Sequence, residues 1–250
     1  MNIQSLAGFI SEWLGVIAVA WMMGIAARFQ KPVTGFKYAR RDGFAALGIA
    51  AVLLVFAFAY QFFNPPTFPD PAPIAPGPIA DLGKALVLAG LGLLPVLAAL
   101  YTRKQPIRSA GWNQPLIVPG LLMGLAIALL TIFLRNRHYD LLLGLDSAEL
   151  TQLFLAIGIA LAEETIFRGY IQLRLVWWLG LWRGILLTSV LYTGWHLAAW
   201  VGRLPADTIV VLVLLTFIQS LVVGWVARRS GGVAAGALYR AISIWATVFP

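Results

Sequence analysis

The chain has 250 residues, of which 60% are hydrophobic and only 11% are charged, and its formal net charge is +8. Soluble domains carry about 25% charged residues, so this composition excludes an ordinary soluble protein and predicts an all-α, polytopic helix bundle in a lipid bilayer, with residues 1–250 as one domain. The basic residues alternate with apolar segments, so we interpret the charge as loop bias and expect no nucleic-acid partner.

Eight segments are apolar and long enough to cross a membrane, at about 20 residues each. They lie at 7–27, 44–63, 85–101, 116–134, 151–173, 181–200, 208–227 and 231–249. The third is short and contains Pro95, so we expect it to be kinked or only partly inserted. The first contains Glu12 and follows no basic region, which predicts a retained anchor and not a cleaved signal peptide. The proline-rich stretch 64–81 is predicted to be an extended external connection without chemistry.

The basic residues of the connections predict the orientation. Connections after the first, third, fifth and seventh spans hold twelve of them: Arg28, Lys31, Lys37, Arg40, Arg41, Arg103, Lys104, Arg108, Arg174, Arg183, Arg228 and Arg229. The other connections hold four: Lys84, Arg135, Arg137 and Arg203. The larger group is expected in the cytoplasm, with both termini outside. We expect the membrane to be the bacterial inner membrane.

Charged residues interrupt the fifth span directly after the apolar run 153–162. A charge near the bilayer centre costs at least ~2.5–3.5 kcal/mol, so such residues usually face the bundle interior and mark function. Glu164 and Arg168 are four residues apart and form a favourable pair on one helix face. Glu163 points about 100° away from Glu164, so its partner must come from another helix.

A histidine in the sixth span is the expected partner of Glu163. Tryptophans surround Gly180 between the fifth and sixth spans, which places this turn at the membrane surface. Glu163 lies 17 positions before Gly180 and His196 lies 16 after it, so an antiparallel hairpin brings the two to the same depth. They could hold a water between them for general acid–base chemistry. The alternative is a buried polar contact that only holds helices together.

Several other chemistries are excluded. The chain has no cysteine, which removes disulfides, thiol nucleophiles and thiolate metal sites, and its two histidines cannot form a three-histidine site. It contains no His-Glu-x-x-His and no Gly-x-Ser-x-Gly sequence. We therefore predict no cofactor, and we leave a metal requirement open.

The sequence Glu163-Glu164-x-x-x-Arg168 resembles the first motif of the intramembrane CAAX prenyl protease and bacteriocin-processing (CPBP) family, also called the abortive-infection family. The second motif of that family, Phe-x-x-x-His, is similar to Tyr192-Thr-Gly-Trp-His196, with tyrosine in place of phenylalanine. The resemblance covers about residues 116–245, which we expect to be the protease-like core. It implies that Glu164, Arg168 and Tyr192 support the site.

The third motif of the family, His-x-x-x-Asn, is altered here. Its register places Arg240 at the histidine and Ile244 at the asparagine. In the family these positions are thought to donate hydrogen bonds to the oxyanion of the tetrahedral intermediate. Arg240, with Ser243 near it, is thus a candidate oxyanion donor. Arg240 could equally act as a structural charge that neutralises the glutamates.

Two functions from different classes follow from these residues. The resemblance implies a glutamic-type endopeptidase in which Glu163 and His196 activate water. From the loop charges, we expect its site to open to the cytoplasm. Its substrate would be a prenylated C-terminal tail or another membrane-associated peptide. The alternative is a protein without this catalysis. It would be an inactive family member that binds peptides or serves as a scaffold, or a proton-coupled transporter that uses the Glu163–His196 pair.

Overall fold

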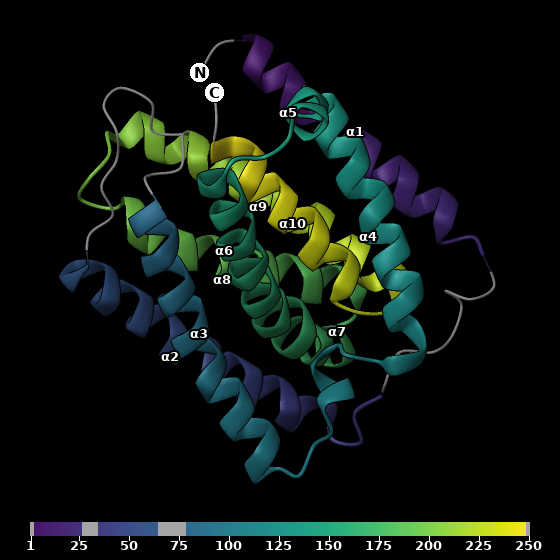
Figure 1. The fold of residues 1–250 in the computed structure, drawn as a ribbon. Coiled ribbons are helices and arrows are strands. Elements are labelled where there is room, and N and C mark those ends of the chain that lie inside the picture. The colour runs from purple at the N-terminus through teal and green to yellow at the C-terminus, as the bar shows by residue number, and fades with distance from the viewer. Residues whose placement is uncertain (1–2, 27–34, 65–78, 249–250) are drawn as a thin grey trace.

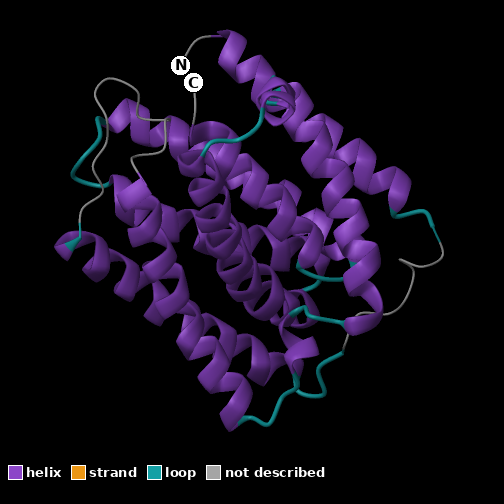
Figure 2. Ribbon diagram, in the orientation of Figure 1, coloured by secondary structure: helices purple, strands orange, loops and turns teal. Residues whose placement is uncertain are grey.

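A computed structural model describes residues 3–26, 35–64 and 79–248. Within these residues the secondary structure is helical, without strands (Figure 2), which confirms the predicted all-α class. The long helices are α1 (Ile3–Met23), α2 (Ala39–Phe63), α3 (Ile79–Thr102), α4 (Gln114–Leu134), α6 (Ser147–Glu164), α8 (Leu181–Trp200), α9 (Ala206–Ser230) and α10 (Ala234–Val248). The shorter ones are η2 (Ile107–Ala110), α5 (His138–Leu143), η3 (Thr165–Gln172) and α7 (Leu173–Leu179).

Each predicted span falls on one of the long helices. Five stretches are long and apolar enough to cross a membrane: Ala39–Phe63, Ile79–Thr102, Ile107–Leu134, Ser147–Leu179 and Ala206–Ser230. The polytopic bundle is therefore confirmed, while the number of eight spans stays a prediction. The third helix is longer than the predicted span, because α3 continues through Pro95 for 24 residues, while its kink and its partial insertion stay predictions. Most of the predicted connection 64–81 lies outside the described residues.

A central helical stretch, formed by α6, η3 and α7 in succession, organises the bundle (Figure 1). Helices α3 and α10 pack against α6, and α2 and α8 pack against α7. Helix α10 also packs against α4, which in turn contacts α1. We call the end of the bundle with the turn between α7 and α8 the Gly180 end. The other end, where α2 and α8 finish and α3 and α9 begin, is the Asn64 end.

Local sequence explains where the central stretch begins and ends. Asp146 caps α6 by accepting a hydrogen bond from the backbone of Glu149, whose side chain accepts one from the backbone of Asp146 in return. Gly180 ends α7 with a φ of +86°, which glycine adopts without strain, and α8 begins at the next residue. A Cβ at Gly184 would lie 2.5 Å from the backbone nitrogen of Val176, so α7 and α8 approach closely.

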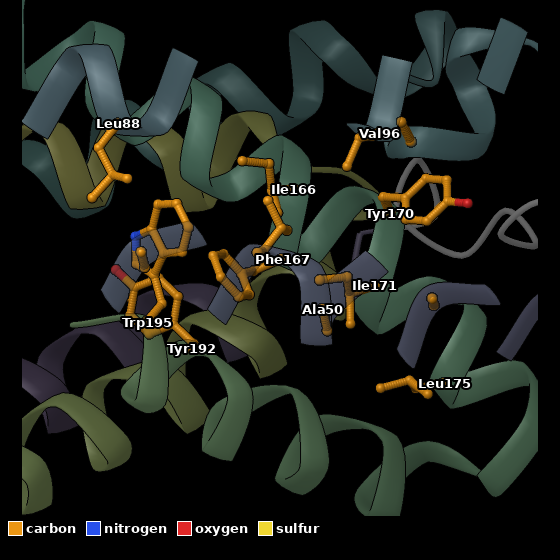
Figure 3. Close-up of a cluster of buried hydrophobic side chains, with 14 of the residues drawn as sticks. Ala50, Leu88, Val96, Ile166, Phe167, Tyr170, Ile171, Leu175, Tyr192 and Trp195 are labelled. Atoms are coloured by element: carbon orange, nitrogen blue, oxygen red, sulfur yellow. The ribbon is translucent and has the colours of Figure 1, made fainter. Parts of the chain in front are cut away.

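A buried apolar cluster fixes the side of α8 that faces the central stretch (Figure 3). The ring of Phe167 meets those of Tyr192 and Trp195 edge to face, with centroids 5.0 and 5.9 Å apart. Ile166 of η3 and Leu88 of α3 belong to the same cluster. Tyr192 and Trp195 are thus held by packing, and their polar atoms are placed next to the end of α6.

Candidate active site

Glu163 lies at the centre of the polar residues inside the bundle, and its side chain is almost completely buried. Its Oε2 accepts hydrogen bonds from the hydroxyl of Tyr192 at 2.9 Å and from Nη2 of Arg240 at 3.3 Å. Its Oε1 accepts one from Nε1 of Trp195 at 3.3 Å. A buried carboxylate is tolerated only with such partners, and here α8 and α10 provide them.

The structure brings His196 to Glu163, as their distances from Gly180 predicted. Nε2 of His196 lies 3.5 Å from Oε2 of Glu163 and has no hydrogen-bond partner in the described structure. Both residues line a cavity of about 140 Å³. The two side chains therefore share one wall of a cavity that has the volume for several water molecules, at about 30 Å³ each.

This cavity extends from Glu163 towards the Asn64 end, where Asn64 and Lys84 line it. A second cavity of about 380 Å³ lies at the Gly180 end and reaches Arg168. The sequence led us to expect a site that opens beside the Gly180 turn. The cavity with the glutamate and histidine lies at the other end, because His196 is only four residues from the end of α8.

Glu164 and Arg168 form the predicted pair, with Oε2 of Glu164 3.6 Å from Nε of Arg168. Both side chains are buried. Nη2 of Arg168 also donates to Oγ of Ser220 at 2.8 Å, which connects the pair to α9. A Cβ at Gly236 would lie 2.7 Å from Oε2 of Glu164, so this glycine of α10 provides the space for the carboxylate. The pair therefore joins three helices beneath Glu163.

The sequence did not predict that Arg168 lies in a π-helix. The segment Thr165–Gln172 has the wider π-helical turn, while α-helix precedes and follows it. Stretches of π-helix are rare and often occur at functional sites. A Cβ at Gly169 would collide with the carbonyl of Ala110 in η2, so the segment also packs tightly against the neighbouring backbone.

Arg240 faces the site, as the register of the third motif predicted. Besides its contact with Glu163, its Nη1 donates to Oε1 of Gln219 at 2.8 Å. Ser243 is connected to Arg240 through Gln219. Its Oγ accepts hydrogen bonds from Nε2 of Gln219 at 3.1 Å and from Nη2 of Arg135 at 3.3 Å. Ile244 packs partly buried among apolar side chains.

The family described as type II CAAX prenyl endopeptidase Rce1-like matches residues 147–245, from the first residue of α6 into α10. Residues 147–245 are thus similar to this CAAX-type intramembrane protease family, which supports the resemblance drawn from the motifs. The match covers less than half of the 250 residues. No curated protein and no solved structure matches the chain.

The residues that match this family include Glu163, Tyr192, His196 and Arg240, but the polar network continues beyond them. Glu12 of α1 is buried and accepts from the hydroxyl of Tyr239 at 2.9 Å and from Nε of Arg135 at 2.7 Å. Glu12 therefore connects α1 both to α10, through Tyr239, and to the end of α4, through Arg135.

Sequence reasoning missed four contributors to the site: Glu12, Trp195, Gln219 and Ser220. Glu12 and Gln219 could have been found, because each is a polar residue within an apolar segment. Trp195 had no such signal, since tryptophan is common in membrane helices and only the fold turns its Nε1 towards Glu163. Within the described residues, no group of three histidine, aspartate or glutamate side chains could hold a metal ion.

Proposed function

We propose that the chain is an intramembrane endopeptidase of the glutamic type. The observation that carries the proposal is the pairing of Glu163 with His196, 3.5 Å apart, on the wall of a cavity, both within the residues that match the Rce1-like family. Ionisable groups within membrane spans are functional by default, and these two lie within reach of one water molecule.

Each step of peptide hydrolysis has a residue in position for it. As the ionised carboxylate, Glu163 accepts a proton from the water while the water oxygen bonds to the scissile carbonyl carbon. His196 orients the same water from its unpartnered Nε2. The carbon–nitrogen bond then breaks, and the proton held by Glu163 goes to the leaving amine. Tyr192 and Arg240 are donors beside the carboxylate and can stabilise the negative charge that develops on the carbonyl oxygen.

We propose a prenylated C-terminal tail or another membrane-associated peptide as the substrate. The family that matches residues 147–245 supports this class, and the candidate spans place the protein in a membrane. No metal ligand set is needed for this route, because the carboxylate itself receives the proton.

One observation favours a second candidate function, a non-catalytic member that binds peptides. Tyr192 and Arg240 stand where the family motifs have phenylalanine and histidine, and both donate to the same oxygen of Glu163. A carboxylate that already accepts these hydrogen bonds is less available to a water. In this alternative the polar cluster would be a structural contact between α6, α8 and α10.

Cleavage by the purified protein in lipid tests the proposal. Glu163→Gln and His196→Ala should each abolish cleavage of a membrane-associated peptide, and the double variant should be no worse, as for residues that act as a unit. Asp207→Asn, an exposed carboxylate at the start of α9, is the matched control and should retain activity. Unchanged cleavage by Glu163→Gln would exclude the catalytic assignment, and peptide binding without cleavage by the unaltered protein would favour the second function.

A further inference from the structure

An exposed basic and aromatic surface lies where α2 begins, beside α7 at the Gly180 end (Figure 1). Its five side chains, which we call the Tyr38 surface, are Lys37, Tyr38, Arg40, Arg41 and Phe44. Except for Lys37, they line a shallow hollow of about 570 Å³ together with Ala39. The surface thus lies at the edge of a candidate membrane span, Ala39–Phe63.

The three cations of this surface lie against its two aromatic rings. The guanidinium carbon of Arg41 is 4.5 Å and Nζ of Lys37 is 5.4 Å from the centroid of the Tyr38 ring. The guanidinium carbon of Arg40 is 5.7 Å from the centroid of the Phe44 ring. A ring attracts a cation at these distances but carries no net charge that would neutralise it. The rings therefore hold the cations in place and leave their positive charge available.

No carboxylate neutralises these cations within the described residues. Asp42 stands next to them in the sequence, but its side chain is buried and its Oδ1 lies 2.8 Å from Nη1 of Arg103. Lys37 and Arg41 lie against the same ring, and like charges this close repel each other. An anion between them would interact favourably with both, so charge complementarity favours an anionic ligand.

Contacts with α7 fix the position of the surface. The Phe44 ring lies 4.6 Å from the ring of Trp178, measured between centroids, and a Cβ at Gly43 would lie 2.5 Å from the same tryptophan. In the segment before α2, the centroid of the Phe36 ring lies 4.7 Å from the guanidinium carbon of the buried Arg174. The segment that carries the cations is thus packed onto α7, so little further ordering is needed when a ligand binds.

We propose that the Tyr38 surface binds the headgroup of an anionic phospholipid. Arginine donors fit the oxygens of a phosphate, and clusters of basic residues next to a membrane span attract anionic lipids. The exposed rings of Tyr38 and Phe44 provide apolar contact for the upper part of the acyl chains, which a free phosphate ion lacks. The site is independent of the proposed cleavage, because it lies at the opposite end of the bundle from the cavity with Glu163.

The test compares phosphatidylglycerol, which is anionic, with phosphatidylcholine of the same acyl chains, which has no net charge. Native mass spectrometry of the full chain in a neutral detergent gives the Kd of each lipid. We expect a Kd at least tenfold lower for phosphatidylglycerol, since each nearby cation contributes about fivefold, or ~1 kcal/mol. The melting temperature should rise with phosphatidylglycerol alone, because a ligand of the folded protein stabilises it. Equal Kd values for the two lipids would overturn the proposal.

Variants locate the preference on the Tyr38 surface. Lys37→Gln, Arg40→Gln and Arg41→Gln together should reduce it to about threefold or less, because the three charges are lost. The matched control removes three other exposed cations at the Gly180 end, with Arg108→Gln, Arg183→Gln and Arg228→Gln, and should keep the full preference. Equal losses in the two triple variants would indicate a diffuse positive field and would overturn the assignment to this surface.

Two further measurements complete the test. If the first triple variant melts early without lipid, Arg41→Gln alone should still lower the preference about fivefold, and an unchanged preference would contradict the proposal. Inorganic phosphate at the lipid concentration should not displace phosphatidylglycerol, since it makes no contact with the rings. Displacement would assign the surface to free phosphate and overturn the lipid site. Glu163→Gln should keep the lipid preference, because Glu163 lies outside this surface.

Discussion

At the scale of single residues, the structure gives Arg240 a partner. The sequence paired Glu164 with Arg168 and left open which glutamate Arg240 would neutralise. In the structure Arg240 bonds to Glu163, while Arg168 faces Glu164. In the first role Arg240 would neutralise the carboxylate of Glu163, and in the second it would donate to a substrate oxyanion beside it. Both roles can be measured with the same variants.

Arg240→Ala is expected to destabilise the protein and to slow it. Removing one partner of a buried ion pair costs about 3–5 kcal/mol of unfolding free energy, because the charge of Glu163 stays buried without compensation. Losing an oxyanion donor lowers turnover by about 10²–10³. Thermal melting in detergent and peptide cleavage measure the two effects.

Second variants separate the two roles. Glu163→Gln added to Arg240→Ala should restore part of the lost stability, whereas Glu164→Gln should restore less, since Glu164 is not hydrogen-bonded to Arg240. Arg240→His should keep more cleavage than Arg240→Ala if the residue donates to the oxyanion. An Arg240→Ala protein as stable and as active as the unaltered one would contradict both roles.

At the scale of elements, the π-helical segment Thr165–Gln172 decides how the first motif is presented. The wider turn changes the direction in which the side chain of Arg168 leaves the helix. In this direction Arg168 contacts Glu164 and also donates to Ser220 of α9. Gly169 lies in the middle of this segment and lets η2 approach. The position of Arg168 thus depends on a close backbone contact.

Gly169→Ala tests this dependence. The added Cβ would collide with the carbonyl of Ala110, and overpacking of this kind costs about 1–3 kcal/mol. We expect a lower melting temperature and weaker cleavage, because the segment that carries Arg168 must shift. Gly90→Ala is the control, since α3 has open space at that position and alanine favours a helix by up to about 1 kcal/mol over glycine. A melting temperature for Gly169→Ala that equals that of Gly90→Ala would contradict this account.

At the scale of the whole molecule, the sequence predicted the helices and one contact across them. Hydropathy located each long helix, and counting residues from Gly180 placed His196 beside Glu163. Both follow from regular helix geometry. The π-helix, the donation from Trp195 and the entry of Glu12 into the network could not be predicted this way. They depend on how the helices are rotated about their axes and pack against each other. The spacing of residues within one helix does not determine this.

The orientation in the membrane and the direction of the cavity are connected. The count of basic residues predicts that the Gly180 end is cytoplasmic, although Arg174, one of the twelve, is buried in α7 and donates hydrogen bonds to the backbone carbonyls of Ser109 and Tyr170. The remaining eleven still exceed four. Because the cavity at Glu163 lies at the Asn64 end, this orientation directs the site to the outside, and a cytoplasmic site requires the reverse orientation.

Single cysteines decide between these orientations, since the chain contains no cysteine of its own. Ala199→Cys places a thiol in the cavity with Glu163 and His196, and Leu181→Cys places one in the cavity at the Gly180 end. A membrane-impermeant maleimide applied to intact cells should label Ala199→Cys and should leave Leu181→Cys unlabelled until the cells are permeabilised, because the basic connections hold the Gly180 end inside. Labelling of Leu181→Cys alone from outside would show that the charge bias does not set this topology. Peptides that reach the cavity at the Asn64 end would then have to come from the cytoplasm.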